Sequence, residues 1–317
     1  MDKGIVKKLI MGTTVFCLLV VLAPGDALSW DLAAHTFIEQ HLYKKQGQTD
    51  SAVLQNRIYG AGALDLFNST FTSPYLEFAA YLHATTADNA LKAWEAAASR
   101  EEKAFAYGFV GHNNAWGMDS TAHISGVTSG KGTGYVIAKA QMLAVMLKPV
   151  LEEAGLNLPD AVLEDVCHYL VESGVDLLVR SLDPTIGSKV MAAAYFRSDQ
   201  APALLINAYA SVFSALAGSP ENAAQIIAAA EGTFRLKMMG YGWALTQDNA
   251  LDLIADSLAE TGAIYLGLPP EYAEVLEPVV KQGILAAMML CAPDFERELR
   301  ATTGWVNGRL SLEGIVW

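Results

Sequence analysis

The feature that most constrains this chain is a series of helical patterns that begins at Tyr135 and continues to residue 292. Apolar residues recur there at three- and four-residue intervals, and short turns such as LDPT and GLPPE separate the segments. The alternation of apolar and polar residues that marks strands is hard to find anywhere in the sequence. We therefore predict an all-α protein, with later helices over 135–154, 160–181, 184–196, 200–217, 220–239, 246–262 and 270–292.

Helical patterns also precede Tyr135. We expect a helix after Trp30, further helices over 74–83 and 88–98, and another that begins after Ser99, where Glu102 completes a capping box. The hydrophobic content of 52% is ample for a large buried core. We expect one domain over 30–200, with residues 201–317 forming a helical region that either completes this domain or is appended to it.

The first 29 residues have the pattern of a secretory signal peptide. Lys3, Lys7 and Lys8 precede an apolar run over 9–24, and the small residues of ALS stand immediately before Trp30. The run is shorter than the roughly 20 residues that a spanning helix needs, so a retained anchor is the weaker alternative. We expect export to the periplasm or the medium without a stable membrane anchor, and a mature chain that begins at Trp30.

The charge balance is acidic. The formal net charge is −13, and removing residues 1–29, with three lysines and two aspartates, leaves −14. A basic surface for nucleic acid is therefore not expected, although bound divalent cations would reverse the field locally at a phosphate site. The mature chain keeps Cys167 and Cys291, which could form a disulfide or remain two buried thiols.

Candidate metal ligands are concentrated in the segment 107–123, which reads YGFVGHNNAWGMDSTAH. It contains His112, Asp119 and His123, and the step from Asp119 to His123 is an i, i+4 spacing that puts two side chains on one helix face. His168 and Glu172 repeat this spacing in a second helical run. Imidazole nitrogens and carboxylate oxygens are ligands that zinc takes, so the two pairs together predict one metal site.

Asp65 is a further candidate metal ligand. It stands between Leu64 and Leu66, and burying a carboxylate among apolar residues without a partner would cost several kcal/mol. We therefore expect a cation or several hydrogen-bond donors around Asp65. The aromatic residues that follow could line a pocket for acyl chains, but packing in the core is the favoured role of Phe67, Phe71, Tyr75 and Phe78.

Taken in order, these motifs resemble the bacterial zinc-dependent phospholipase C family, whose superfamily includes fungal single-strand-specific nucleases. The resemblance covers roughly residues 30–180. It is carried by Trp30 with a histidine five residues later, YGAGALD ending in Asp65, a histidine at 83, the GFVGH segment, Asp-x3-His and a later His-x3-Glu.

The resemblance implies a multi-helix bundle with up to three zinc ions in a cleft between helices. One ion would be held by His35 and by the amino group and carbonyl of Trp30. Asp119 would also bind this ion and would bridge it to a second. Asp65, His83 and His112 would hold that second ion. His123, His168 and Glu172 would hold the third. Signal-peptide cleavage would then have a chemical purpose, because the α-amino group is a ligand only when Trp30 is the first residue.

The spacing between His112 and Asp119 predicts a break in the helix. Family members usually place the aspartate four residues after the corresponding histidine, but Trp116 occupies that position here. Seven residues of unbroken helix span about 10.5 Å, too far for ligands of one cluster. We therefore expect a bend near Trp116 and Gly117.

The function implied by the resemblance is hydrolysis of a phosphodiester, as a phospholipase C acting on a phospholipid at a membrane surface, with Asp65 orienting or deprotonating the attacking water. Nothing but the resemblance selects a lipid, and the sequence sets neither the head group nor the oligomeric state. Two alternatives stay open. One is a secreted zinc nuclease or nucleotidase, and the other is a non-catalytic helical protein with a degraded metal site.

Overall fold

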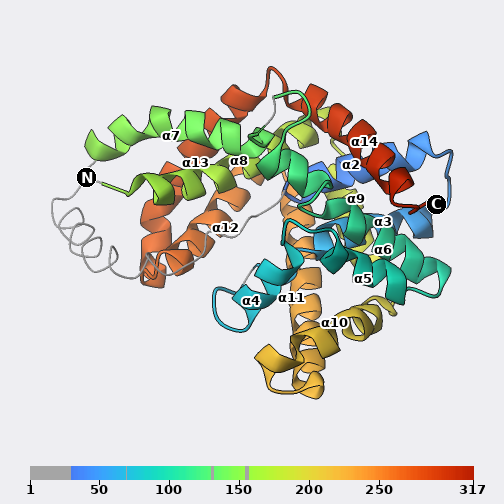
Figure 1. Cartoon of the computed structure of the whole chain (residues 1–317). Coiled ribbons are helices and arrows are strands. Elements are labelled where there is room, and N and C mark those ends of the chain that lie inside the picture. Colours follow the sequence, from blue (N-terminus) through green and yellow to red (C-terminus); the bar gives the residue numbers. More distant parts are fainter. Residues whose placement is uncertain (1–29, 69, 130–131, 154–156) are drawn as a thin grey trace.

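The computed structural model describes residues 30–317 except 69, 130–131 and 154–156, so the predicted signal peptide lies outside the described residues. The prediction of an all-α protein is confirmed: the described residues form helices and no strand (Figure 1). The helices are α2 (Leu32–Lys45), α3 (Ser51–Ala63), α4 (Tyr75–Leu82), α5 (Asp88–Ala96), α6 (Arg100–His112), the π-helix η2 (Ser120–Ile124), α7 (Tyr135–Glu153), α8 (Asp160–Leu182), α9 (Ile186–Phe196), α10 (Ala201–Ala217), α11 (Pro220–Thr246), α12 (Ala250–Tyr265), the 3₁₀-helix η3 (Pro270–Tyr272), α13 (Ala273–Cys291) and α14 (Phe295–Leu312).

Local capping explains several helix starts. Ser99 accepts a hydrogen bond from the backbone of Glu102, whose carboxylate accepts one from the Ser99 backbone, so the predicted capping box is confirmed. Ser219 caps α11 by accepting a hydrogen bond from the Asn222 amide, and Pro220 fills the first helical position, where no backbone donor is needed. Some boundaries differ from prediction. Helix α11 continues to Thr246 rather than residue 239, and α12 spans Ala250–Tyr265 rather than 246–262. Helix α14 was not predicted.

The buried apolar residues form two large clusters. One lies among α2, α7, α8, α12, α13 and α14, and the other among α3, α4, α5, α6, α9, α10 and α11. Each cluster combines residues from before and after position 200. Phe67 and Phe78 are buried in the second cluster, as expected for packing residues. Cys167 and Cys291 are both buried free thiols.

Helix α14 packs against α2 and holds the segment that follows α6. The Trp305 indole donates a hydrogen bond to the Trp116 carbonyl at 2.8 Å, and the Thr302 and Thr121 hydroxyls lie 3.0 Å apart. The buried carboxylate of Glu298 accepts hydrogen bonds from the backbone of Val127. The C-terminal part of the chain therefore supports the segment that carries Asp119 and His123.

Within the described part of the chain, no single helix is long and apolar enough to cross a membrane. Two pairs of consecutive helices satisfy the length and composition criteria together, but each pair is bent by more than 70°. These are α9 with α10, and the segment 270–291 with α14.

Candidate metal centre

The side chains proposed as ligands converge from six separate segments of the chain. Most of them stand at helix ends or in the turns that follow, and only His168 and Glu172 lie in the middle of a long helix, α8. Three groups have ligand atoms within 4.8 Å of one another, a spacing at which each group could hold a metal ion. They are His35, His112 and Asp119; Asp65, His83 and His112; and His123, His168 and Glu172.

Two carboxylates anchor the start of α2 and so place Trp30 and His35. Asp31 caps the helix through a 2.7 Å bond from the Leu32 amide. Asp176, on α8, accepts hydrogen bonds from the next two backbone amides at 2.7 and 2.8 Å. The Trp30 side chain is buried, its indole donates to the Thr121 hydroxyl at 3.2 Å, and the His35 ring hydrogen-bonds with the Trp30 backbone. The backbone of Trp30 therefore lies beside the first group.

A tight turn after α6 brings Asp119 back to His112. The side chain of Asn113 accepts hydrogen bonds from the Ala115 and Trp116 amides at 2.9 and 3.0 Å, and the Gly117 amide donates to the Asn113 carbonyl at 2.9 Å. A Cβ on Gly117 would lie only 2.6 Å from the Asn113 nitrogen, so the turn requires glycine. The predicted break exists, but it begins at Asn113 rather than near Trp116. The Asn113 side chain ends the helix by competing for backbone donors.

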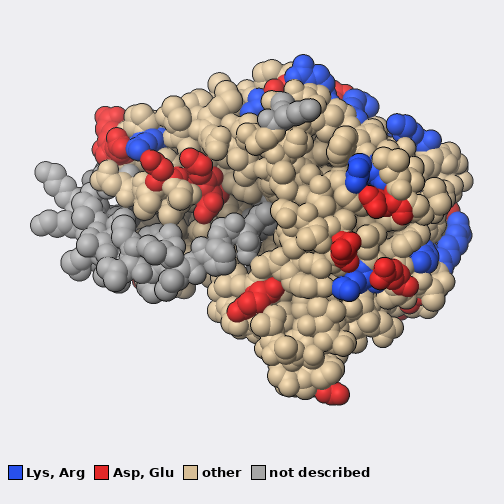
Figure 2. All heavy atoms as spheres, viewed as in Figure 1, with Lys and Arg blue, Asp and Glu red and all other residues tan. Residues whose placement is uncertain are grey.

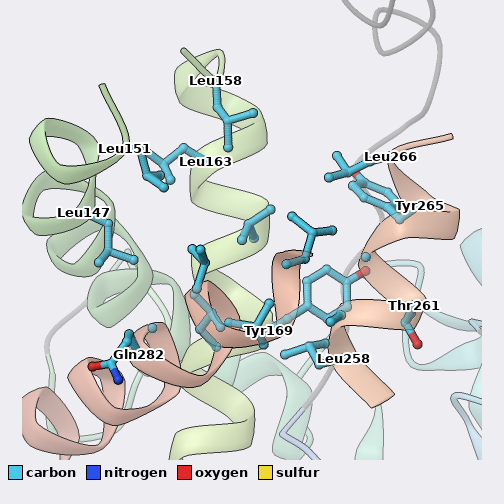
Figure 3. Close-up of a pocket in the computed structure, with 18 of the residues that line it drawn as sticks. Leu147, Leu151, Leu158, Leu163, Tyr169, Leu258, Thr261, Tyr265, Leu266 and Gln282 are labelled. Atoms are coloured by element: carbon cyan, nitrogen blue, oxygen red, sulfur yellow. The ribbon is translucent and has the colours of Figure 1, made fainter. Parts of the chain in front are cut away.

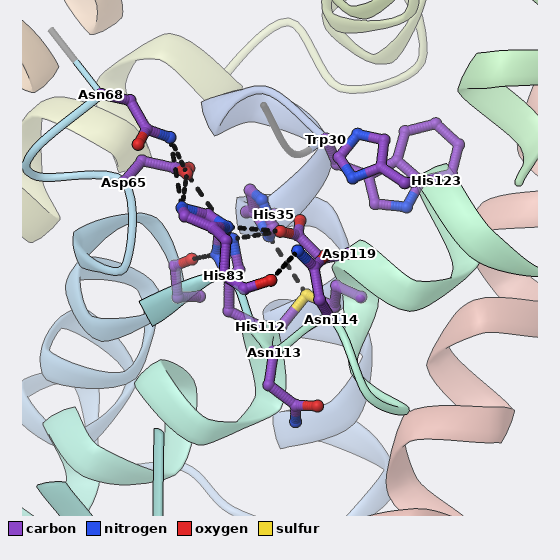
Figure 4. A network of polar contacts seen from close by, with 12 residues as sticks. Trp30, His35, Asp65, Asn68, His83, His112, Asn113, Asn114, Asp119 and His123 are labelled. Atoms are coloured by element: carbon purple, nitrogen blue, oxygen red, sulfur yellow. Dashed lines mark hydrogen bonds and ion pairs between the residues drawn. The ribbon is translucent and has the colours of Figure 1, made fainter. Parts of the chain in front are cut away.

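Asp119 lies between two imidazoles, and Asp65 approaches the same two from the other side (Figure 4). The Oδ2 atom of Asp119 is 3.0 Å from His112 Nε2 and 3.2 Å from His83 Nδ1. The Oδ1 atom of Asp65 is 3.2 Å from His83 Nε2 and 3.7 Å from His112 Nε2. His35 stacks on His112 with ring centroids 4.5 Å apart. The first two groups thus share His112 and form one continuous ligand set.

The charges of this set are strongly coupled. Burial opposes ionisation of Asp119, but His112 and His83 hold its pKa well below the usual range. Burial would lower the pKa of His83, but hydrogen bonds with Asp119 and Asp65 raise it to about 10. Burial likewise opposes a charge on His112, yet Asp119 and Asp65 raise its pKa. For His35, burial and the neighbouring His112 lower the pKa well below its ordinary value, as a neutral ligand requires.

The third group joins η2 to α8. His168 Nε2 lies 2.8 Å from Glu172 Oε1 and 3.1 Å from His123 Nε2, and His123 Nε2 is 3.5 Å from the same Glu172 oxygen. Burial lowers the pKa of His123 well below its ordinary value, and His168 adds to this effect. Burial, together with Asp31 and Asp65, raises the pKa of Glu172 well above its usual range. A cation among these atoms would offset the cost of burying the carboxylate.

Asp119 and His123 belong to different groups. The Oδ2 atom of Asp119 lies at His112, whereas Nε2 of His123, in the π-helix η2 that begins directly after Asp119, lies at His168. The other pair, His168 and Glu172, does share one face of α8, as predicted.

The donor sets fit a tetrahedral ion. With zinc–ligand bonds of about 2.0–2.1 Å, neighbouring ligand atoms in a tetrahedron are about 3.3 Å apart. The three separations in the third group bracket this value, and those of Asp65 and Asp119 to the imidazoles lie near it. Asp119 Oδ1 and His123 Nδ1 are buried without a hydrogen-bond partner among the described residues. Such atoms are unusual in native interiors and are expected where an ion or water binds.

Three neighbours of the ligands were missed by sequence reasoning. Asn68 donates to Asp65 Oδ1 at 2.7 Å, Asn114 donates to the His83 carbonyl at 2.7 Å, and Met118 Sδ lies 3.3 Å from His35 Nδ1. Asn68 stands three residues after Asp65, a spacing that could have drawn attention to it. The other two lie in the turn after α6, whose path the sequence did not reveal.

Comparison with known proteins adds no family to this geometry. The chain matches no protein-family model, no curated protein and no solved structure. Any assignment of function therefore depends on the arrangement of the ligands and on the motifs of the sequence.

Proposed function

We propose that this protein is an exported zinc-dependent phosphodiester hydrolase of the phospholipase C type. The single observation that supports this most is the convergence of eight His, Asp and Glu side chains into three adjoining groups with tetrahedral ligand spacing. Imidazole-rich sets with carboxylates favour zinc over magnesium or calcium, which prefer oxygen ligands alone. Several ions close together are typical of enzymes that cleave phosphate esters.

When bound, the ions neutralise phosphate oxygens and make a water molecule more acidic. The residues of the chain supply the remaining functions. Asp65 is the candidate to orient and deprotonate the attacking water, because its side chain is 20% exposed, whereas that of Asp119 is fully buried. Asn68 holds one oxygen of Asp65 through its amide, which leaves the other oxygen to accept a proton. Asp119, in contact with both His83 and His112, is suited to bridge two ions.

Trp30 fits the role of an amino-terminal ligand. Its backbone is held at the His35 ring, and the amides that follow it are fixed by Asp176. Cleavage directly before Trp30 would place a new α-amino group beside the first metal group. Export and processing would then complete the site.

A phospholipid is preferred over a nucleic acid as substrate. The chain is strongly acidic, and on the face shown in Figure 2 the described Lys and Arg side chains lie singly or beside acidic neighbours, without a continuous basic surface. Single-strand binding commonly uses a positively charged groove.

The test compares hydrolysis of phosphatidylcholine and of single-stranded DNA by the exported protein with added zinc, alongside its zinc content. We expect two or more zinc ions per chain, activity on the phospholipid, and loss of activity in Asp65→Asn with the fold intact by circular dichroism. Cleavage of DNA but not of lipid would establish the nuclease alternative. At most one bound zinc, with thermal stability unchanged in His168→Ala, would exclude a catalytic centre.

A further inference from the structure

An apolar cavity of about 370 Å³ lies among α7, α8, α12 and α13 (Figure 3). Its lining includes Leu147 and Leu151 from α7, Leu163 and Tyr169 from α8, and Leu258 from α12, and none of the described lining residues is charged. Protein interiors rarely leave voids larger than a water molecule. A cavity of this volume is within the range of ligand sites, and apolar cavities take apolar ligands.

The cavity borders the third metal group. Tyr169 lines it and directly follows the ligand His168, and the two rings are 5.9 Å apart. Tyr169 contacts Tyr265, another lining residue, with centroids 6.4 Å apart. Tyr265 in turn packs edge-on against Phe71, with ring centroids 5.5 Å apart. Phe71 follows the turn that carries Asp65. Aromatic rings therefore connect the metal centre to the cavity.

The mouth of the cavity opens on an apolar surface. Val150 and Val279 both line the cavity and are 61% and 45% exposed. Further large apolar side chains are exposed on the same helices, among them Val145 and Met146 on α7, Ile264 on α12 and Met289 on α13. Several large exposed apolar side chains on the helices that line a cavity favour a lipid or membrane contact.

We propose that this cavity binds an acyl chain of the lipid whose phosphodiester is held at the metal centre. The inference rests on the proposed phospholipid hydrolysis and adds a binding site to it, namely this cavity for one long aliphatic chain of the substrate. A polar head group has no partner in a lining without charged side chains, whereas an aliphatic chain gains from every methylene it buries there. The chain would run from the phosphate beside His168 past Tyr169 into the cavity, with its far end towards Val150 and Val279.

Gly262 provides a direct test. It lines the cavity from α12, and an added Cβ would meet no atom within 4 Å, so Gly262→Leu fills part of the space without a clash. Gly240, on α11 and outside the lining, has equally open surroundings, and Gly240→Leu is the matched control. The measurement is the ratio of KM for a long-chain phosphatidylcholine to that for a water-soluble short-chain analogue. Excluding two or three methylenes should raise this ratio at least about tenfold in Gly262→Leu and leave it unchanged in the control.

A second pair of variants places a charge at the mouth. Val150→Glu lies at an exposed position, so folding should tolerate it, and Val145→Glu on the same helix is more exposed and lies outside the lining. We expect the KM ratio to rise with the first variant and not with the second. An unchanged ratio in both Gly262→Leu and Val150→Glu would overturn the inference.

Binding of a fluorescent long-chain fatty acid separates this inference from the proposed function, because binding needs no catalysis. Weakening by about tenfold in Gly262→Leu supports an acyl-chain site even if no phosphodiester is hydrolysed. Equal binding by the wild type and Gly262→Leu, with normal hydrolysis, overturns the site and leaves the hydrolase.

Discussion

The carbonyl oxygen of Ala61 lies 2.6 Å from Nδ1 of His112. A carbonyl can only accept, so His112 carries a hydrogen on Nδ1, and Nε2, which faces Asp65 and Asp119, is the nitrogen left to bind a metal. This contact joins α3 to the last residue of α6. Backbone acceptors of this kind fix the tautomer and orientation of metal-binding histidines. The packing of α3 on α6 therefore prepares the ligand that the first two groups share.

Gly108 allows this packing, and replacing it should damage both stability and metal binding. A Cβ on Gly108 would overlap the Arg57 carbonyl and lie 2.8 Å from the Ala61 nitrogen, which would push α3 away from α6. We expect Gly108→Ala to lower the free energy of unfolding by at least about 2 kcal/mol and to weaken zinc binding. Gly232→Ala on α11, where a Cβ meets nothing, should change stability by less than about 1 kcal/mol. Equal denaturant midpoints for the two variants would contradict this explanation.

The third group should hold its own ion. His123→Ala removes one of three converging ligands, and we expect the zinc content measured by mass spectrometry to fall by one ion per chain while the helical content is kept. The control is His41→Ala, because His41 lies outside the three groups and its Nδ1 donates to the Phe37 carbonyl at 2.8 Å. A zinc content that falls equally in both variants would show that the loss is not due to a ligand at position 123.

The raised pKa of His83 predicts how zinc-depleted protein responds to pH. Asp119 and Asp65 raise this pKa to about 10 from an ordinary value of 6.5, so the charged imidazole stabilises the fold fully below pH 6.5, and this contribution is lost as pH rises through 10. With chelator present, the thermal unfolding midpoint should decrease as the pH rises from 6.5 to 10. The decrease should be smaller in His83→Asn. Zinc must displace the same proton, so calorimetry at pH 7 should record proton release on binding. Identical pH profiles for the wild type and His83→Asn would count against this assignment.

An amino-terminal ligand at Trp30 makes the exact start of the mature chain important. One additional residue before Trp30 would convert the α-amino group into an amide, which is a poor metal ligand. We expect such a chain to bind less zinc and to hydrolyse phosphatidylcholine at least about tenfold more slowly, as for other lost ligand interactions. After zinc removal, the extended chain and the chain that begins at Trp30 should have the same thermal unfolding midpoint. Full activity in the extended chain would exclude the α-amino group as a ligand.

Local sequence signals were sufficient to predict a helix whose start is stabilised by residues within its own first turn. The capping box of Ser99 and Glu102 was predictable because both partners lie within one turn. Helix α14 was missed because its sequence, FERELRATTGWVNGRLSL, combines two internal glycines with many polar residues and lacks a clear apolar pattern. It is stabilised instead by tertiary contacts, such as the Trp305 indole on the Trp116 carbonyl.

The sequence by itself determined an all-α protein and the types of ligand available, because helical periodicity and residue chemistry are local properties. It also indicated that the chain must bend between His112 and Asp119, since a straight helix would separate them. Only the tertiary structure showed that these ligand atoms come within binding distance of one another. Asp119 meets His112, His123 meets His168, and Asn68 joins Asp65 in the turn after α3. These outcomes depend on backbone turns and on the close contact of α3 with α6, which pair residues far apart in the sequence.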